Sequence, residues 1–128
     1  MINITDENIF GKVIADALAT VGNNPELDEA GRKRCVNAIA KAAARIEQSG
    51  TWMNLDDETG NMLIWSDSNE IYEIGPACDN CQCSAFEHGN LCWHRVATRL
   101  IQRYTEAVEA SECEKVLRMS ASAEGVTI

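Results

Sequence analysis

Four of the six cysteines and both histidines fall within one short stretch, residues 78–94. Two pairs in it, Cys81 with Cys83 and Cys92 with His94, carry the ligand types that Zn²⁺ prefers. Side chains at i and i+2 of an extended segment point the same way, so the first pair can offer two sulfurs to one ion. A Gly-Asn turn between the pairs can fold the second pair back onto the first. Three thiolates and one imidazole close a tetrahedron, so the spacing predicts a structural zinc site.

The ligands need surrounding elements to hold them, and the sequence shows patterns for a sheet and a helix. Short β-branched and aromatic runs separated by turn residues predict three strands, over residues 51–55, 61–65 and 70–74. Strands joined by such short turns form an antiparallel meander. The second ligand pair lies at the start of a long helix whose apolar residues recur at steps of three and four: Trp93, Val96, Ala97, Leu100, Ile101, Tyr104 and Val108.

Two further helices are predicted ahead of the strands. Thr5 is a suitable N-cap for the first helix. Asn24-Pro25 favours an N-cap followed by proline at the first position of a second helix, which extends to Gln48, with Gly31 as a potential break. Its expected apolar stripe is Val36, Ile39, Ala40, Ala43 and Ile46. These elements together predict a single α+β domain over residues 1–128.

The motif Cys-x-Cys, eight residues, Cys-x-His and an apolar helix resembles a SWIM-type zinc finger. Phe86 and the Tyr72-Glu73-Ile74 strand add to the resemblance, which covers roughly residues 62–104. It implies a structural zinc ion and a module that binds nucleic acid or protein. Trp93 stands where a basic residue is common in that family. The expected organisation is a helical part (1–50), a zinc module (51–119) and a flexible tail (120–128).

The formal net charge is −9, and its distribution is uneven. No Lys or Arg lies between Ile46 and His94, a span that holds nine acidic residues. Nucleic-acid binding draws most of its affinity from neutralised phosphates, so this half of the chain would repel a duplex. Basic residues gather instead on the two long helices: Arg32, Lys33, Arg34, Lys41 and Arg45 on one, and Arg95, Arg99 and Arg103 on the other.

The remaining cysteines and the second histidine have other possible roles. Cys78 forms a Cys-x-x-Cys with Cys81, so it is an alternative zinc ligand or half of a redox dithiol. His88 is expected to be an exposed loop residue, and Cys35 and Cys113 to be small buried apolar residues in helices, with a dimer disulfide as the alternative if one faces outward. Six cysteines also allow 15 disulfide pairings. The first residues do not have the pattern of a signal peptide and no apolar run approaches ~18 residues, so we expect a cytoplasmic protein with reduced thiols and no contact with membranes.

Recognition, not catalysis, is the expected role. The chain shows no Gly-rich phosphate loop and no serine elbow. Residues 76–81 weakly resemble the Pro-Cys-x-x-Cys motif of nucleobase deaminases, but the upstream histidine that would complete such a zinc site is missing. Three recognition functions are possible. The first hypothesis is a module that docks on a protein partner through its acidic half, with Trp52 or Trp65 in the contact if either side chain is exposed. The second is nucleic-acid binding through Arg95, Arg99 and Arg103. The third is an inhibitor, of the kind found in phages or mobile elements, that mimics nucleic acid with Asp56, Asp57, Glu58, Asp67 and Glu70. Either a monomer or a homodimer fits these hypotheses.

Overall fold

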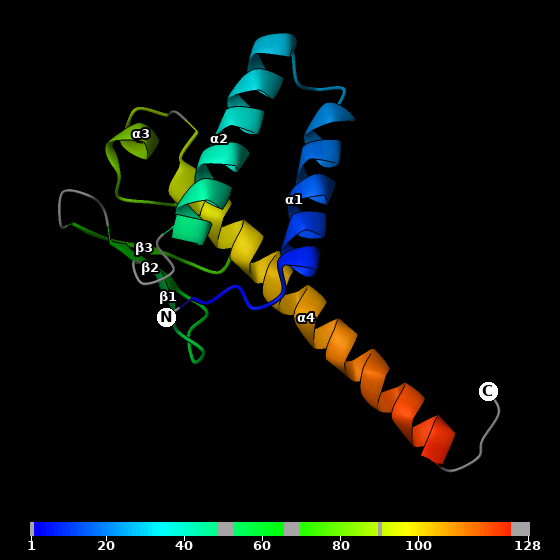
Figure 1. Ribbon diagram of the computed structural model, residues 1–128. Coiled ribbons are helices and arrows are strands. Elements are labelled where there is room, and N and C mark those ends of the chain that lie inside the picture. Colours follow the sequence, from blue (N-terminus) through cyan, green and yellow to red (C-terminus); the bar gives the residue numbers. More distant parts are fainter. Residues whose placement is uncertain (1, 49–52, 66–69, 90, 124–128) are drawn as a thin grey trace.

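Two antiparallel helices, a small sheet and a long C-terminal helix make up the fold (Figure 1), so the predicted α+β class is confirmed. The structure, a computed structural model, describes residues 2–48, 53–65, 70–89 and 91–123, with side chains up to residue 119. The elements are α1 (Glu7–Gly22), α2 (Glu29–Gln48), β1 (Met53–Leu55), β2 (Met62–Trp65), β3 (Ile71–Ile74), α3 (Ser84–Glu87) and α4 (Trp93–Ala123). In the described part of the chain, no helix is both long and apolar enough to cross a membrane.

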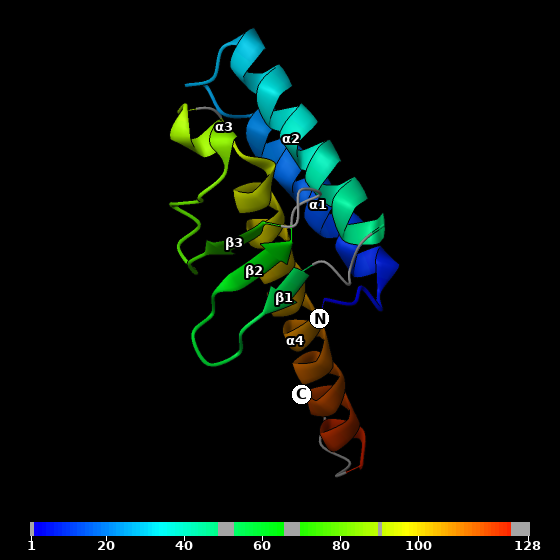
Figure 2. The ribbon, with the colours of Figure 1, turned by 90° about the vertical axis from the view of Figure 1, so that its left-hand side faces the viewer.

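The sheet is the predicted meander, with the order β1-β2-β3 and both pairs antiparallel. Met53 pairs with Ile64, and Met62 pairs with Ile74. These four side chains are at most 1% exposed and belong to the core cluster. Figure 2 shows that the sheet lies beside α4. The opposite face of the sheet, called the open face here, carries the half-buried or exposed side chains of Leu63, Trp65, Ile71 and Glu73.

The first helix starts one residue later than its predicted cap implies. Asp6, not Thr5, is the N-cap, and its carboxylate accepts a hydrogen bond from the Ile9 N–H at 3.0 Å. The reason lies in α4, where the Tyr104 hydroxyl accepts hydrogen bonds from the backbone N–H groups of Thr5 and Asp6 at 3.1 and 3.0 Å. The Phe10 ring packs edge-on against Tyr104 at 5.8 Å. A contact from almost a hundred residues away therefore decides which residue caps α1.

The predicted start of the second helix at Asn24-Pro25 is wrong. Instead, the side-chain carbonyl of Asn24 accepts a hydrogen bond from the Glu26 N–H at 3.0 Å and closes a local turn. The helix begins at Glu29, and Asp28 caps it by accepting from the Gly31 N–H at 2.6 Å. Gly31 does not break the helix. It is buried, and a Cβ there would lie only 3.0 Å from the Asp28 carboxylate oxygen.

The buried face of α2 is turned relative to the predicted stripe. Ile39, Ala42 and Ile46 are at most 5% exposed, whereas Val36 is 41% exposed and Ala40 also faces outward. Alanine contributes little to a hydrophobic pattern, so the sequence of an alanine-rich helix only weakly indicates which of its faces is buried. The two isoleucines, seven residues apart, fix the face that is seen.

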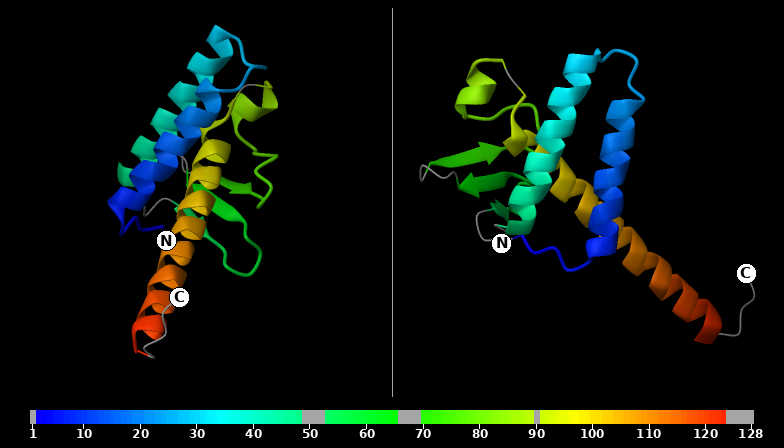
Figure 3. Two further views of the ribbon diagram at one scale, coloured as in Figure 1. Left: turned by 90° about the vertical axis from the view of Figure 1, so that its right-hand side faces the viewer. Right: turned by 45° about the horizontal axis from the view of Figure 1, so that its top comes forward.

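One cluster of buried side chains joins all parts of the chain. It contains Phe10 of α1, Ile46 of α2, Met62 of β2, the ligand Cys92 and Ile101 of α4. The N-terminal helices and the zinc-binding segment therefore share a core. Beyond this core α4 continues to Ala123, past residue 120 where a tail was expected, and its C-terminal part projects away from the rest of the described chain (Figure 3).

Candidate metal centre

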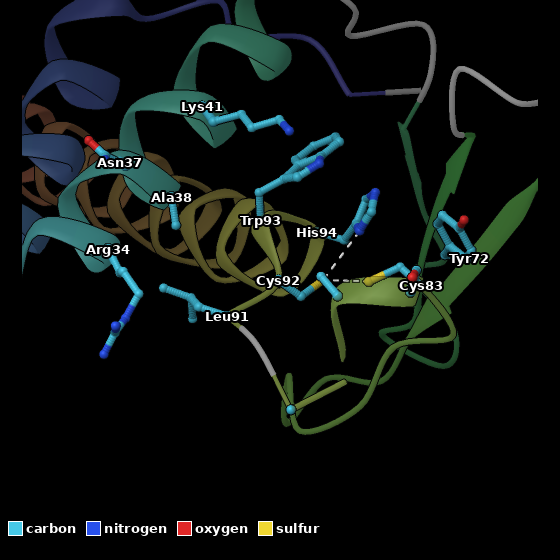
Figure 4. A pocket seen from close by; sticks show the side chains of 13 residues that line it. Arg34, Asn37, Ala38, Lys41, Tyr72, Cys83, Leu91, Cys92, Trp93 and His94 are labelled. Atoms are coloured by element: carbon cyan, nitrogen blue, oxygen red, sulfur yellow. Dashed lines mark hydrogen bonds between the residues drawn. The ribbon is translucent and has the colours of Figure 1, made fainter. Parts of the chain in front are cut away.

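The structure brings Cys81, Cys83, Cys92 and His94 together at one buried point. Their ligand atoms all lie within 4.8 Å of one another. The Cys92 Sγ is 3.3 Å from the Cys83 Sγ and 3.2 Å from the His94 Nδ1, which is 3.8 Å from the Cys81 Sγ (Figure 4). Metal–ligand bonds of about 2.0–2.3 Å in a tetrahedral zinc site place the ligand atoms about 3.5–3.8 Å apart. The four atoms therefore fit one Zn²⁺, with Nδ1 as the histidine ligand.

Local turns deliver the first cysteine pair. Cys83 has extended backbone (φ −76°, ψ 159°) and is the N-cap of α3, a short helix that the sequence analysis did not predict. After it, Gly89 adopts φ +74°, a left-handed conformation that suits glycine, and the chain turns back toward Cys92. The Gln82 side chain ties this loop to β3, because it accepts from the Glu73 N–H at 2.8 Å and donates to the Glu73 carbonyl at 3.0 Å.

Burial sets the protonation of the ligands before metal is considered. It raises the pKa of Cys92 to about 12 and also raises the pKa of Cys81. At Cys83 burial acts in the same direction, but hydrogen bonds from the Phe86 backbone and from neighbouring thiols outweigh it, so its pKa is lowered. Burial, followed by nearby cations, lowers the pKa of His94 to about 4. The imidazole is therefore neutral, as a ligand must be, while the thiols need a cation to become thiolates.

A layer of rings and cations surrounds the histidine ligand. The His94 ring lies 4.9 Å from Tyr72 of β3 and 4.2 Å from Trp93. Above Trp93 stand Lys41 and Arg45 of α2, whose charged groups are 5.8 and 5.7 Å from the ring centroid. Three thiolates around Zn²⁺ carry about one net negative charge. The cations of α2 offset this charge, and the sequence signal for them was their spacing of four residues on one helical face.

The other candidate ligands lie apart from this cluster. Cys78 is buried, but it is not among the four residues that meet, and its thiol contacts the Gln102 side chain at 3.6 Å. His88 is exposed, as expected. Cys35 is half-buried, whereas Cys113 is exposed, so the expectation that Cys113 is buried is wrong. The helix that carries it has already left the core at that point.

The predicted arginine row has a structural use at two of its three positions. Arg95 donates from Nε to the Cys78 carbonyl at 2.6 Å, and its guanidinium stands 5.1 Å from the Phe86 ring. Arg99 donates to the Ala77 carbonyl at 3.2 Å. Arg103, the third member, is exposed. Two arginines thus fasten the turn ahead of the zinc site to α4.

The acidic candidates lie around the sheet. Three of them, Asp56, Asp57 and Glu58, are exposed in the turn between β1 and β2, and Glu70 is exposed just before β3. Hydrogen bonds from the Glu58 N–H and the Thr59 hydroxyl lower the pKa of Asp56, so it keeps its charge. Asp67 and Trp52 lie outside the described residues.

The site and fold define a class of protein: a finger in which three cysteines and one histidine hold a structural zinc ion between a sheet and a helix. Residues 55–98 match the family model described as SWIM zinc finger. The resemblance is therefore confirmed, and the chain contains a SWIM-type zinc finger with Zn²⁺ as its structural cofactor. Neither the comparison with curated proteins nor the comparison with solved structures found a match.

Proposed function

We propose that the protein is a non-enzymatic recognition module that docks on a protein partner through the open face of its sheet. The observation that carries this proposal is the composition of that face. Leu63 and Trp65 of β2 are half-buried and Ile71 of β3 is 54% exposed, whereas Met62, Ile64 and Ile74 on the other face of these strands are buried. Trp65 pairs directly with Ile71, so the two side chains stand side by side.

Charge indicates the kind of partner. Glu73 shares the open face with Leu63, its pairing neighbour. Exposed acids border the face at Glu70 and in the turn that contains Asp57. An apolar centre with an acidic rim matches a partner with a basic rim around an apolar patch. An enzyme whose basic groove normally holds nucleic acid is one such partner. Binding to that groove would block the enzyme, as the inhibitor hypothesis requires.

The zinc site supports recognition without chemistry. All four positions of a tetrahedral shell are supplied by the protein, so no position is left for a substrate or an activated water. The ligand side chains are at most 7% exposed. The ion's part is to fasten the finger loop to the start of α4, which keeps the sheet rigid.

Affinity purification from the native host with and without nuclease, followed by mass spectrometry, tests this function. A partner that survives nuclease and is lost with the Trp65→Ala/Ile71→Lys variant supports the proposal. The matched control is Val36→Lys, since Val36 is a 41% exposed apolar residue on α2. A partner that binds the open-face variant and the wild type equally would contradict it.

A cleft between α2 and the finger favours a second candidate, nucleic-acid binding. It encloses about 820 Å³, and its lining includes the cations Arg34 and Lys41 and the aromatic residues Trp93 and Tyr72 (Figure 4). None of its described lining residues is acidic, in a chain of net charge −9. Cations beside aromatic rings are the features that single strands use.

Fluorescence anisotropy with a labelled single strand at low salt tests the second candidate. If the cleft binds nucleic acid, Arg34→Glu/Lys41→Glu weakens binding and lowers its salt dependence. Lys12→Glu on α1 is the matched control, because Lys12 is exposed and does not line the cleft. No binding by wild type at micromolar protein would remove this candidate.

A further inference from the structure

An apolar groove runs between the three long helices, and none of the zinc ligands or the residues of the open face lines it. Its volume is about 590 Å³. Val13 and Ala17 of α1, Ile39 of α2 and Leu100 of α4 line it. Such a groove between helices is suited to a further apolar helix.

The same chain carries a helical segment whose apolar side chains are exposed. The side chains of α4 that pack on the core extend only as far as Val108. Beyond it, Val116, Leu117 and Met119 are 62, 68 and 71% exposed. We call residues 109–119 the α4 extension. α4 is one continuous helix whose C-terminal part leads away from α1 and α2 (Figures 1 and 3), so the extension cannot fold back into the groove of its own chain.

The groove wall and the extension lie on one face of the same helix. From Leu100 the groove-lining residues of α4 continue through Arg103 to Ala107 at steps of three and four. Ala110 and Leu117 follow at steps of three and seven, so they share this face. The wall from Val96 to Ala107 is about 16 Å long and the extension about 15 Å, at 1.5 Å per residue. A half-turn rotation about an axis near Val108 would therefore place the extension of one copy along the groove wall of another.

Both surfaces carry charges of both signs, so oppositely charged side chains can pair across them. The charged residues that line the groove are two cations of α4, Arg99 and Arg103, and two acids, Asp16 of α1 and Glu106 of α4. The α4 extension bears both signs, as Glu109, Glu112, Glu114, Lys115 and Arg118. The acids of the α4 extension can face the two arginines of the groove, and its lysine can face a carboxylate of the groove. Such pairing would favour this docking over the docking of an uncharged helix.

We propose that two copies of this chain form a symmetric dimer in which each α4 extension occupies the groove between α1, α2 and α4 of the other. In a two-fold arrangement each contact occurs twice, so a modest helix–groove contact is doubled. The dimer keeps the zinc ligands, the open face and the cleft cations Arg34 and Lys41 outside the groove, which shares Leu91 with the cleft. It therefore adds an assembly state to the recognition module and does not depend on the partner proposed above.

Sedimentation equilibrium of the zinc-loaded, reduced protein across a range of concentrations tests the dimer. Leu117→Glu removes the extension's contact, and Ala17→Glu obstructs the groove. Each is expected to raise the dissociation constant at least about tenfold, since burial of one leucine side chain is worth about a tenfold to a hundredfold in affinity. Leu18→Glu is the matched control, because Leu18 is 37% exposed, adjoins Ala17 and does not line the groove. Zinc content checks that each variant is folded. If Ala17→Glu does not fold, Thr20→Glu is used in its place to obstruct the groove.

A mixture of the two variants shows which surfaces meet. Leu117→Glu keeps an intact groove and Ala17→Glu keeps an intact extension, so the mixture should form a heterodimer through one remaining contact while neither variant dimerises alone. If Ala17→Glu alone dimerises fully, the extensions pair with each other and the proposal is overturned. If Leu117→Glu alone dimerises fully, the grooves pair with each other and it is equally overturned. A wild type that is monomeric at all concentrations would also overturn it, and the groove would then be left for a helix from a different protein.

Discussion

Replacement of Cys92 by serine is the sharpest perturbation of the zinc centre. Cys92 is 1% exposed, and its sulfur is 3.3 Å from that of Cys83 and 3.2 Å from the His94 nitrogen. Serine offers no thiolate at neutral pH, so the ion loses one of four ligands. Zinc binding in small fingers is worth about 10–16 kcal/mol, which is about 2.5–4 kcal/mol per ligand if shared equally. A buried hydroxyl without a partner adds about 1–3 kcal/mol.

We therefore expect Cys92→Ser to lower the free energy of unfolding by at least about 3 kcal/mol, a large part of the ~5–15 kcal/mol typical of a domain. Atomic emission on the reduced protein measures zinc per chain, and urea unfolding followed by circular dichroism measures stability. Both should fall together, because the metal binds only the folded finger.

Cys78→Ser is the matched control. Cys78 is 7% exposed and lies three residues before Cys81, but its thiol faces Gln102 and not the ligand cluster. It should keep one zinc per chain and lose about 1 kcal/mol or less, in the range of a single hydrogen bond. Full zinc content and unchanged stability in Cys92→Ser would refute the assignment of the site, and zinc loss in Cys78→Ser would show that Cys78 is a ligand.

Three further predictions concern the surroundings of the site and the helix contacts. Tyr104→Phe removes an acceptor for two backbone N–H groups at the start of α1, at 3.1 and 3.0 Å, and should cost about 1–3 kcal/mol in urea unfolding; an unchanged midpoint would contradict this. Zinc affinity should rise with pH, because uptake displaces protons from thiols such as Cys92, whose pKa burial raises to about 12. Chelator competition should show a gain of about a hundredfold to a thousandfold per pH unit near neutrality, for two to three released protons, and a flat profile would count against three thiolate ligands. Gln82→Ala opens the edge of β3, so hydrogen exchange at the Glu73 amide should become faster, and equal rates would show that the 2.8 Å bond does not protect it.

The sequence was sufficient for the zinc site because its chemistry is local and specific. Two ligand pairs at fixed spacing, and a helix that starts at the second pair, left few ways to arrange Cys81 and His94 other than around one ion. The strands followed from short apolar runs between turns. Each was predicted one or two residues too long, or extended into residues that the structure does not describe, as at Met53.

The helix starts and the second layer of the site required tertiary information. Asp6 and Asp28 prevailed as caps because distant contacts and local turns placed them, and Thr5 and Asn24 had the same capping chemistry. Similarly, the sequence of α2 predicts only that its basic residues face solvent. The fold shows that one of them, Lys41, lies over the Trp93 ring beside the ligand histidine. Spacing shows which residues share a face, but it does not show what that face meets.

The zinc centre and the proposed recognition face are mechanically connected. Gln82 lies between the two ligands Cys81 and Cys83, and its side chain makes both hydrogen bonds to the backbone of Glu73. β3 also carries Ile71, the most exposed apolar residue of the open face. When the ion fixes the positions of the two cysteines, it fixes the edge of the strand as well. Release of the ion should free that edge and loosen the surface built on it. We therefore expect binding of the proposed partner through the open face to require zinc, even without contact between the partner and the metal.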